Sequence, residues 1–94
     1  FVASDVVAFG AISAIYEAGY RIPEDIALVG FDDVPMAGFV TPRLTTVHVP
    51  IYELAKKAGS VCIQLINGEP PKTKIELLDT HLIVRESSGA NRAK

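Results

Sequence analysis

The sequence has few of the features of membrane, secreted or disordered proteins. No apolar run approaches the roughly 18 residues that a membrane-spanning helix needs, and the start lacks the basic, apolar and small-residue sectors of a signal peptide. The single cysteine, Cys62, cannot form an internal disulfide framework, so a reducing cytoplasm fits best. With 49% hydrophobic residues, the chain is also too apolar for a disordered segment.

Positive charge and catalytic motifs are sparse as well. The 9 lysines and arginines are dispersed and outnumbered by 11 acidic residues, so they form no basic stripe for nucleic acid. No P-loop, GxGxxG, GxSxG or HExxH pattern occurs. His48 and His81 have no ligand-spaced cysteine, histidine or aspartate nearby, and Cys62 fits a small core residue. We therefore expect no catalytic residues, no metal and no cofactor.

The 94 residues are one ordinary soluble domain or a piece of one, since domains usually have about 100 to 200 residues. The chain does not begin with Met, and residues 1–3 resemble the end of a buried strand, so we expect it to open inside a longer protein. Helical spacing of Phe9, Ile12 and Tyr16 then predicts an amphipathic helix that ends at Gly19. The continuous apolar run 26–31 predicts a strand buried on both faces.

A strand, a helix and a strand within about 30 residues form a right-handed crossover, which predicts an α/β layer with a parallel sheet. The segment 45–49 is expected to be extended. Apolar residues at helical spacing predict a second helix from Pro50 to Gly68. Two more strands are expected at 74–78 and 81–85, followed by a mobile polar tail, 87–94.

Two polar pairs follow predicted strands, where ligands of open parallel sheets bind. Ser4 and Asp5 follow the first strand, and Asp32 and Asp33 follow the second. The two oxygens of Asp32 suit a pair of sugar hydroxyls or base N–H groups, although a turn cap is an equally good reading. For Ser4 and Asp5, helix capping is favoured over ligand contact. Adjacent Asp32 and Asp33 point to opposite faces in extended geometry, so they form no acid/base dyad.

A cluster of large apolar residues, Met36, Phe39 and Val40, lies in an irregular stretch flanked by Gly38 and Pro42. Such a cluster covers either the domain's own core or a partner subunit. The residues alone slightly favour the core.

The order of several motifs closely resembles the C-terminal part of LacI/GalR-family transcriptional regulators. The resemblance rests on the segments 3–5 (ASD), 29–33 (VGFDD) and 42–47 (PRLTTV), and it extends through residue 87. It implies a periplasmic-binding-protein-like effector domain with two α/β lobes, present here as a C-terminal fragment. Residues 1–48 and 81–86 would belong to the C-terminal lobe and residues 50–78 to the N-terminal lobe.

The resemblance also implies roles for individual residues. Asp32 matches the family's effector-gripping aspartate, and Ser4 matches a cleft-facing position that is often Asn. Asp5 matches a helix cap at the rim of the cleft. A dimer interface is implied for a set of apolar side chains, namely Phe9, Met36, Phe39 and Val40.

The implied function is that of a cytoplasmic repressor that binds a sugar or nucleobase and forms a homodimer or higher oligomer. Operator DNA would be bound only through an N-terminal domain outside these residues, and the helix 51–66 would leave apolar surface that drives self-association. A periplasmic sugar-binding protein is the main alternative. A receiver domain fits less well, because no acceptor aspartate follows the strand that ends at His48. A dehalogenase-like phosphatase would need an acidic residue where Val34 stands.

Overall fold

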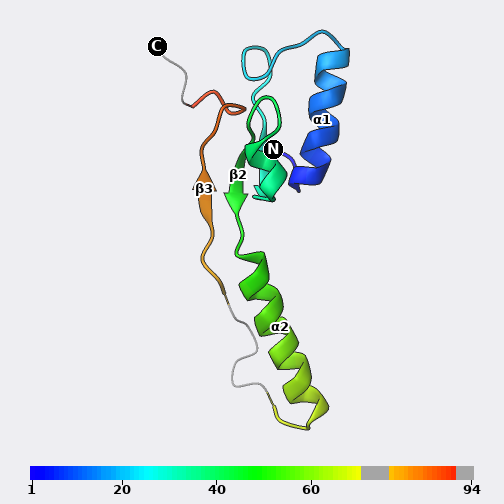
Figure 1. Cartoon of the computed structure of the whole chain (residues 1–94), viewed down its shortest axis with the longest axis vertical. Helices are drawn as coiled ribbons and strands as arrows, with labels where there is room; N and C mark the ends of the chain where they lie inside the picture. Colours follow the sequence, from blue (N-terminus) through cyan, green and yellow to red (C-terminus); the bar gives the residue numbers. More distant parts are fainter. Residues whose placement is uncertain (71–76, 91–94) are drawn as a thin grey trace. The chain divides into compact units, whose positions relative to one another are not determined.

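The computed structural model describes residues 1–70 and 77–90 of the 94-residue chain. Two compact units make up the chain (Figure 1). Unit 1 comprises residues 1–49 with those from 81 onward, and unit 2 comprises residues 50–80. Within the described ranges, no helix combines the length and the apolarity that crossing a membrane requires.

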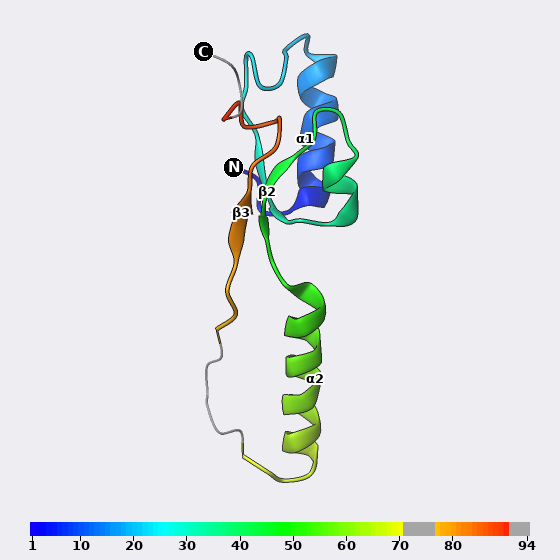
Figure 2. The ribbon, with the colours of Figure 1, turned by 60° about the vertical axis from the view of Figure 1, so that its left-hand side comes forward.

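Unit 1 contains a three-stranded sheet in the order β1-β2-β3. Figure 2 shows β3 beside β2. Strands β1 (Val29–Asp32) and β2 (Thr45–His48) pair in parallel, which confirms the α/β class. Strand β3 (His81–Ile83) pairs with β2 in antiparallel fashion, so the all-parallel sheet that we expected was wrong in its third strand. Residues 50–80, which form unit 2, separate β2 from β3 along the chain.

Helix α1 (Asp5–Glu17) packs against β1 through a face that includes Ala8 and Ile12. The helix ends near its predicted stop, because Gly19 takes a left-handed φ of +85° that favours glycine. Tyr16, predicted on the packed face, is 43% exposed. The small core of unit 1 joins this helix to the loops and the short 3-10 helix η1 (Pro35–Gly38), and its buried members are Ala8, Ile12, Ile22, Leu28, Ala37 and Leu44.

Several predicted boundaries were wrong because other partners occupy the backbone. The strand predicted over 26–31 begins only at Val29, since the Leu28 N–H donates to the Ser87 carbonyl. The strand predicted over 81–85 ends at Ile83, since the Arg85 N–H donates to the Thr45 hydroxyl at 2.8 Å. Residues 1–3 form no strand, although the Val2 N–H donates to the Val29 carbonyl.

The polar tail begins later than predicted. Ser87 is fully buried, and its hydroxyl accepts the Thr45 N–H at 2.8 Å and donates to the Leu28 carbonyl at 2.7 Å. Ser87 is therefore part of the packed structure of unit 1. Residues 91–94 lie outside the described residues.

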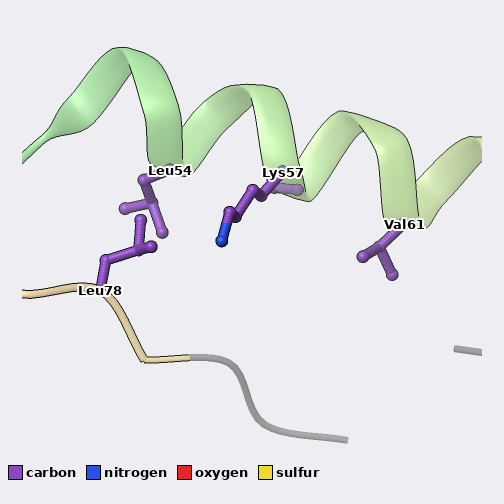
Figure 3. A pocket seen from close by; sticks show the side chains of 5 residues that line it. Leu54, Lys57, Val61 and Leu78 are labelled. Carbon is purple, nitrogen blue, oxygen red and sulfur yellow. The ribbon is translucent and has the colours of Figure 1, made fainter. Parts of the chain in front are cut away.

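Unit 2 contains α2 (Ile51–Ile66), which follows Pro50 and ends before Gly68, as predicted. No residue of α2 is buried, and Cys62, expected in a core, is exposed. Leu54 and Leu78 point toward one another across an apolar groove of about 290 Å³ (Figure 3). Of the strand predicted at 74–78, residues 74–76 lie outside the described residues, and Leu77 and Leu78 are not in a strand.

Candidate ligand-binding site

The candidate site is the turn at the carboxyl end of β1. Asp32 and Asp33 both have left-handed backbones there, with φ of 121° and 61°. Residues other than glycine pay a free-energy penalty in this region, so such a turn persists only where its surroundings hold it. This turn is also the place where the sequence predicted a ligand.

Asp33 is held by two cationic or potentially cationic side chains. Arg85 Nη2 donates to Oδ1 of Asp33 at 2.9 Å, and His48 Nδ1 lies 2.9 Å from Oδ2. Burial by itself would raise the pKa of the Asp33 carboxyl. The hydrogen bonds from His48 and Arg85, together with their charges, outweigh that effect and hold the pKa below its ordinary value of 3.8. Both oxygens of Asp33 are therefore occupied within the protein.

Asp5 holds the turn in place through its buried carboxyl group. Its carboxyl is fully buried, with Oδ1 accepting the Thr46 hydroxyl at 2.7 Å and Oδ2 accepting the Val34 N–H at 2.9 Å. The prediction that Asp5 caps α1 was wrong, because its side chain turns inward to these donors. Gly30 is needed beside it, since a Cβ at that position would overlap Asp5 Oδ1. The contact to Val34 also places the start of α1 beside the 32–34 turn.

Ser4 is the residue that caps α1. Its hydroxyl oxygen accepts the Val7 N–H at 3.3 Å, and Ser4 has the extended backbone typical of an N-cap. A hydroxyl that accepts one bond can still donate its hydrogen to a second group. Capping is therefore compatible with the predicted ligand contact.

Asp32 differs from its neighbours in the availability of its side chain. Its backbone carbonyl accepts the Val49 N–H at 3.3 Å, and it is half-buried. Among the described residues, its carboxyl group has neither a hydrogen bond nor an ion pair. Within residues 1–70 and 77–90, no group of three His, Cys, Asp or Glu side chains has a geometry suited to a metal ion. The Asp32 carboxyl, which has no partner among the described residues, can accept hydrogen bonds from a ligand.

The sequence did not predict the hydrogen bonds that hold Asp33. Arg85 was counted among the dispersed basic residues, and His48 was considered only as a metal ligand and rejected. His48 also contacts His81, with ring centroids 4.9 Å apart. The adjacent aspartates at the end of a strand were the signal that could have indicated these bonds. Two neighbouring carboxylates repel each other, so a cationic partner for one of them is expected.

The four predicted interface residues divide into two pairs. Met36 and Phe39 are 55% and 80% exposed on and after η1. Phe9 and Val40 are half-buried and pack against the core of unit 1. The first pair therefore forms exposed apolar surface, whereas the second pair packs in the chain's own core.

Residues 1–88 match a family described as periplasmic binding protein-like domain. The ribose operon repressor of Halalkalibacterium halodurans is 42% identical over 88 residues, which cover 94% of this chain and 27% of that protein. The transcriptional repressor CytR of Escherichia coli is 36% identical over 90 residues, covering 96% and 26%. The chain thus spans about a quarter of the length of these relatives.

Two solved structures extend the similarity to the fold. A LacI-family regulator from Enterococcus faecalis with bound ribose has a TM-score of 0.79 and 33% identity, covering 90% of this chain and 32% of that one. A periplasmic binding protein/LacI regulator from Alkaliphilus metalliredigens, complexed with D-xylulofuranose, has a TM-score of 0.82 and 32% identity, covering 94% and 33%. The chain therefore belongs to the periplasmic binding protein-like domain family, in the form found in LacI-family transcriptional regulators.

Proposed function

We propose that this chain is the effector-sensing and dimerisation part of a cytoplasmic transcriptional repressor that responds to a sugar. The observation that carries the proposal is the Asp32 carboxyl group, which sits at the end of a parallel strand without a partner among the described residues. Ligands of open α/β sheets bind at this end of the strands. The chain itself makes and breaks no covalent bond.

A sugar suits this carboxyl group because two adjacent hydroxyls can each donate to one of its oxygens. The Ser4 hydroxyl contributes a third polar group from the neighbouring start of α1. One relative named for ribose, one with bound ribose and one with bound D-xylulofuranose favour a sugar over a nucleobase.

The proposed mechanism is linkage between effector and DNA. Unit 1 would be part of the C-terminal lobe and residues 50–78 part of the N-terminal lobe. A sugar that binds one lobe arrangement more tightly shifts the population toward it, and operator affinity changes by the same coupling free energy. Operator DNA would be contacted by a domain outside these residues. A homodimer through Met36 and Phe39, bordered by Phe9 and Val40, would transmit the change.

The experiment uses the full-length protein and four sugars: D-ribose, D-xylulose, lactose and cellobiose. Isothermal titration calorimetry measures binding by the wild type, by Asp32→Asn and by the control Glu24→Gln, which changes an exposed carboxyl elsewhere in unit 1. Loss of a charged hydrogen bond costs about 1.5–3 kcal/mol, or roughly 10- to 150-fold in affinity. Equal affinities for wild type and Asp32→Asn would refute the proposed site.

A second measurement separates a repressor from a periplasmic sugar-binding protein. The sugar that binds should change the affinity of the full-length protein for DNA from its own promoter region in a mobility-shift assay. Sugar binding without any DNA binding would favour the periplasmic alternative.

A further inference from the structure

Several polar groups of the 32–34 turn are held by hydrogen bonds within unit 1, whereas the Asp32 side chain is not. The Asp33 N–H donates to the Thr46 hydroxyl at 3.3 Å, and the Val34 N–H donates to the buried Asp5 carboxyl at 2.9 Å. The Asp33 carboxyl is held by Arg85 and His48. Strained residues held by this many hydrogen bonds are found mainly at functional sites, so the turn is expected to do more than reverse the chain.

We propose that Asp33 and Arg85 are positioning residues, which hold the left-handed turn and thereby aim the Asp32 carboxyl at the effector. This inference rests on the proposed function. Neither residue needs to touch the ligand, since both oxygens of Asp33 are occupied and its side chain is only 15% exposed.

Arg85 is suited to this task because its three hydrogen bonds connect the turn with the start of β2 and with the residue before that strand. Its Nη2 donates to Asp33 Oδ1 at 2.9 Å, its Nη1 donates to the Leu44 carbonyl at 2.9 Å, and its backbone N–H donates to the Thr45 hydroxyl at 2.8 Å. The planar guanidinium imposes a fixed geometry on such a set of bonds, which the single ammonium of a lysine does not. The side chain is 22% exposed, so water screens the ion pair only in part.

The restraint on Asp33 affects the ligand through the backbone of Asp32, because the backbone angle of Asp32 sets the direction of its carboxyl group. A left-handed φ of 121° at Asp32 directs its side chain away from the alternation of β1. If the Asp33 side chain is not held, residue 33 can leave its φ of 61°. The backbone of residue 32 is then no longer restrained to its own positive φ. An ordinary extended backbone at residue 32 would then point the carboxyl away from the ligand. The fraction of molecules in the binding-competent conformation would fall, and the apparent affinity would fall with it.

The test is a double-mutant cycle in the full-length protein, with affinity measured by calorimetry for the tightest binder among D-ribose, D-xylulose, lactose and cellobiose. We expect Asp33→Ala and Arg85→Lys each to weaken binding at least 5-fold. Asp33→Asn should stay within about 3-fold of wild type, because asparagine tolerates a left-handed backbone and keeps an acceptor for Arg85. In an Asp32→Asn background, Asp33→Ala should change affinity less than 2-fold.

The outcomes separate this inference from the proposed function. An unchanged affinity in Asp32→Asn, or no binding of any of the four sugars, would remove the proposed function. Suppose that Asp32→Asn strongly weakens sugar binding, and that Asp33→Ala weakens it by the same factor in the wild type and in the Asp32→Asn background. That result would overturn the positioning role and leave the proposed function intact. A crystal structure of ligand-free Asp33→Ala gives an independent readout: we expect φ at residue 32 to become negative, and an unchanged positive φ would overturn the positioning role.

Discussion

Gly30→Ala should destabilise unit 1 strongly, although it adds only one methyl group. The new Cβ would overlap Asp5 Oδ1 and would lie 3.0 Å from Cδ2 of the fully buried Leu44. The Asp5 side chain would have to move, and its 2.7 Å bond from the Thr46 hydroxyl would be lost. Overpacking costs about 1–3 kcal/mol, and a lost hydrogen bond to a buried carboxyl costs about 1.5–3 kcal/mol. We therefore expect a total loss of about 2.5–6 kcal/mol in the free energy of unfolding.

Urea denaturation of the full-length protein, followed by circular dichroism, measures this loss. Gly10→Ala is the matched control, because a Cβ at that exposed helical position meets nothing within 4 Å. Alanine in place of glycine inside a helix should stabilise the protein by up to about 1 kcal/mol. A Gly30→Ala variant within about 0.5 kcal/mol of wild type would refute the packing argument.

A second variant shows whether Asp5 is the obstacle. Asp5→Ala should cost about 2–5 kcal/mol, since the Thr46 hydroxyl and the Val34 N–H both lose a buried partner. In that background the added Cβ of Gly30→Ala meets only Leu44. The double variant should therefore be less destabilised than the sum of the single variants by about 1.5 kcal/mol or more. Additive effects would contradict the proposed clash.

Three further predictions concern acid sensitivity, dimerisation and self-association. Because the folded-state pKa of Asp33 lies below its ordinary value of 3.8, its stabilising contribution is complete above about pH 5 and is lost as pH falls through and below 3.8. Asp33→Asn should lower the melting temperature at pH 7, and the difference from wild type should shrink by about pH 3; a pH-independent difference would count against the ion pair. Phe39→Asp should shift the full-length protein from dimer to monomer in sedimentation equilibrium, whereas Tyr20→Asp, at another exposed aromatic, should not. The isolated 94-residue chain should self-associate in light scattering, because no residue of α2 is buried, and Leu54→Lys should reduce this association. A monodisperse monomer for the unmodified chain would contradict that expectation.

The sequence was sufficient to predict the two long helices, because these follow from local periodicity. It also predicted a parallel sheet, but from a crossover between residues 1–3 and 26–31, whereas the parallel pair in the structure is β1 with β2. It could not predict where strands end when distant side chains take up backbone groups. The Arg85 N–H, for example, donates to the hydroxyl of Thr45, 40 positions away along the chain. Such partners become visible only once the fold brings them together.

In the candidate site, too, some features could be predicted from the sequence and others depend on distant partners. Position at the end of a strand made Asp32 a candidate, with a turn cap as an equally good reading, and the resemblance to the family then favoured the ligand role. The roles of Ser4 and Asp5 were harder to separate, because both residue types cap helices well and they are adjacent. The structure separates them, because the two oxygens of the buried Asp5 carboxyl accept the Thr46 hydroxyl and the Val34 N–H, whereas Ser4 accepts the Val7 N–H of the helix.

A crystal structure of the full-length protein with its tightest-binding sugar tests the central claim most directly. We predict that both carboxyl oxygens of Asp32 accept hydrogen bonds from sugar hydroxyls, at about 2.5–3.0 Å. The 32–34 turn should keep its left-handed backbone, with Asp33 still held by Arg85. A bound sugar whose hydroxyls are satisfied by other residues, with the Asp32 carboxyl directed into solvent, would contradict the proposed function of this site.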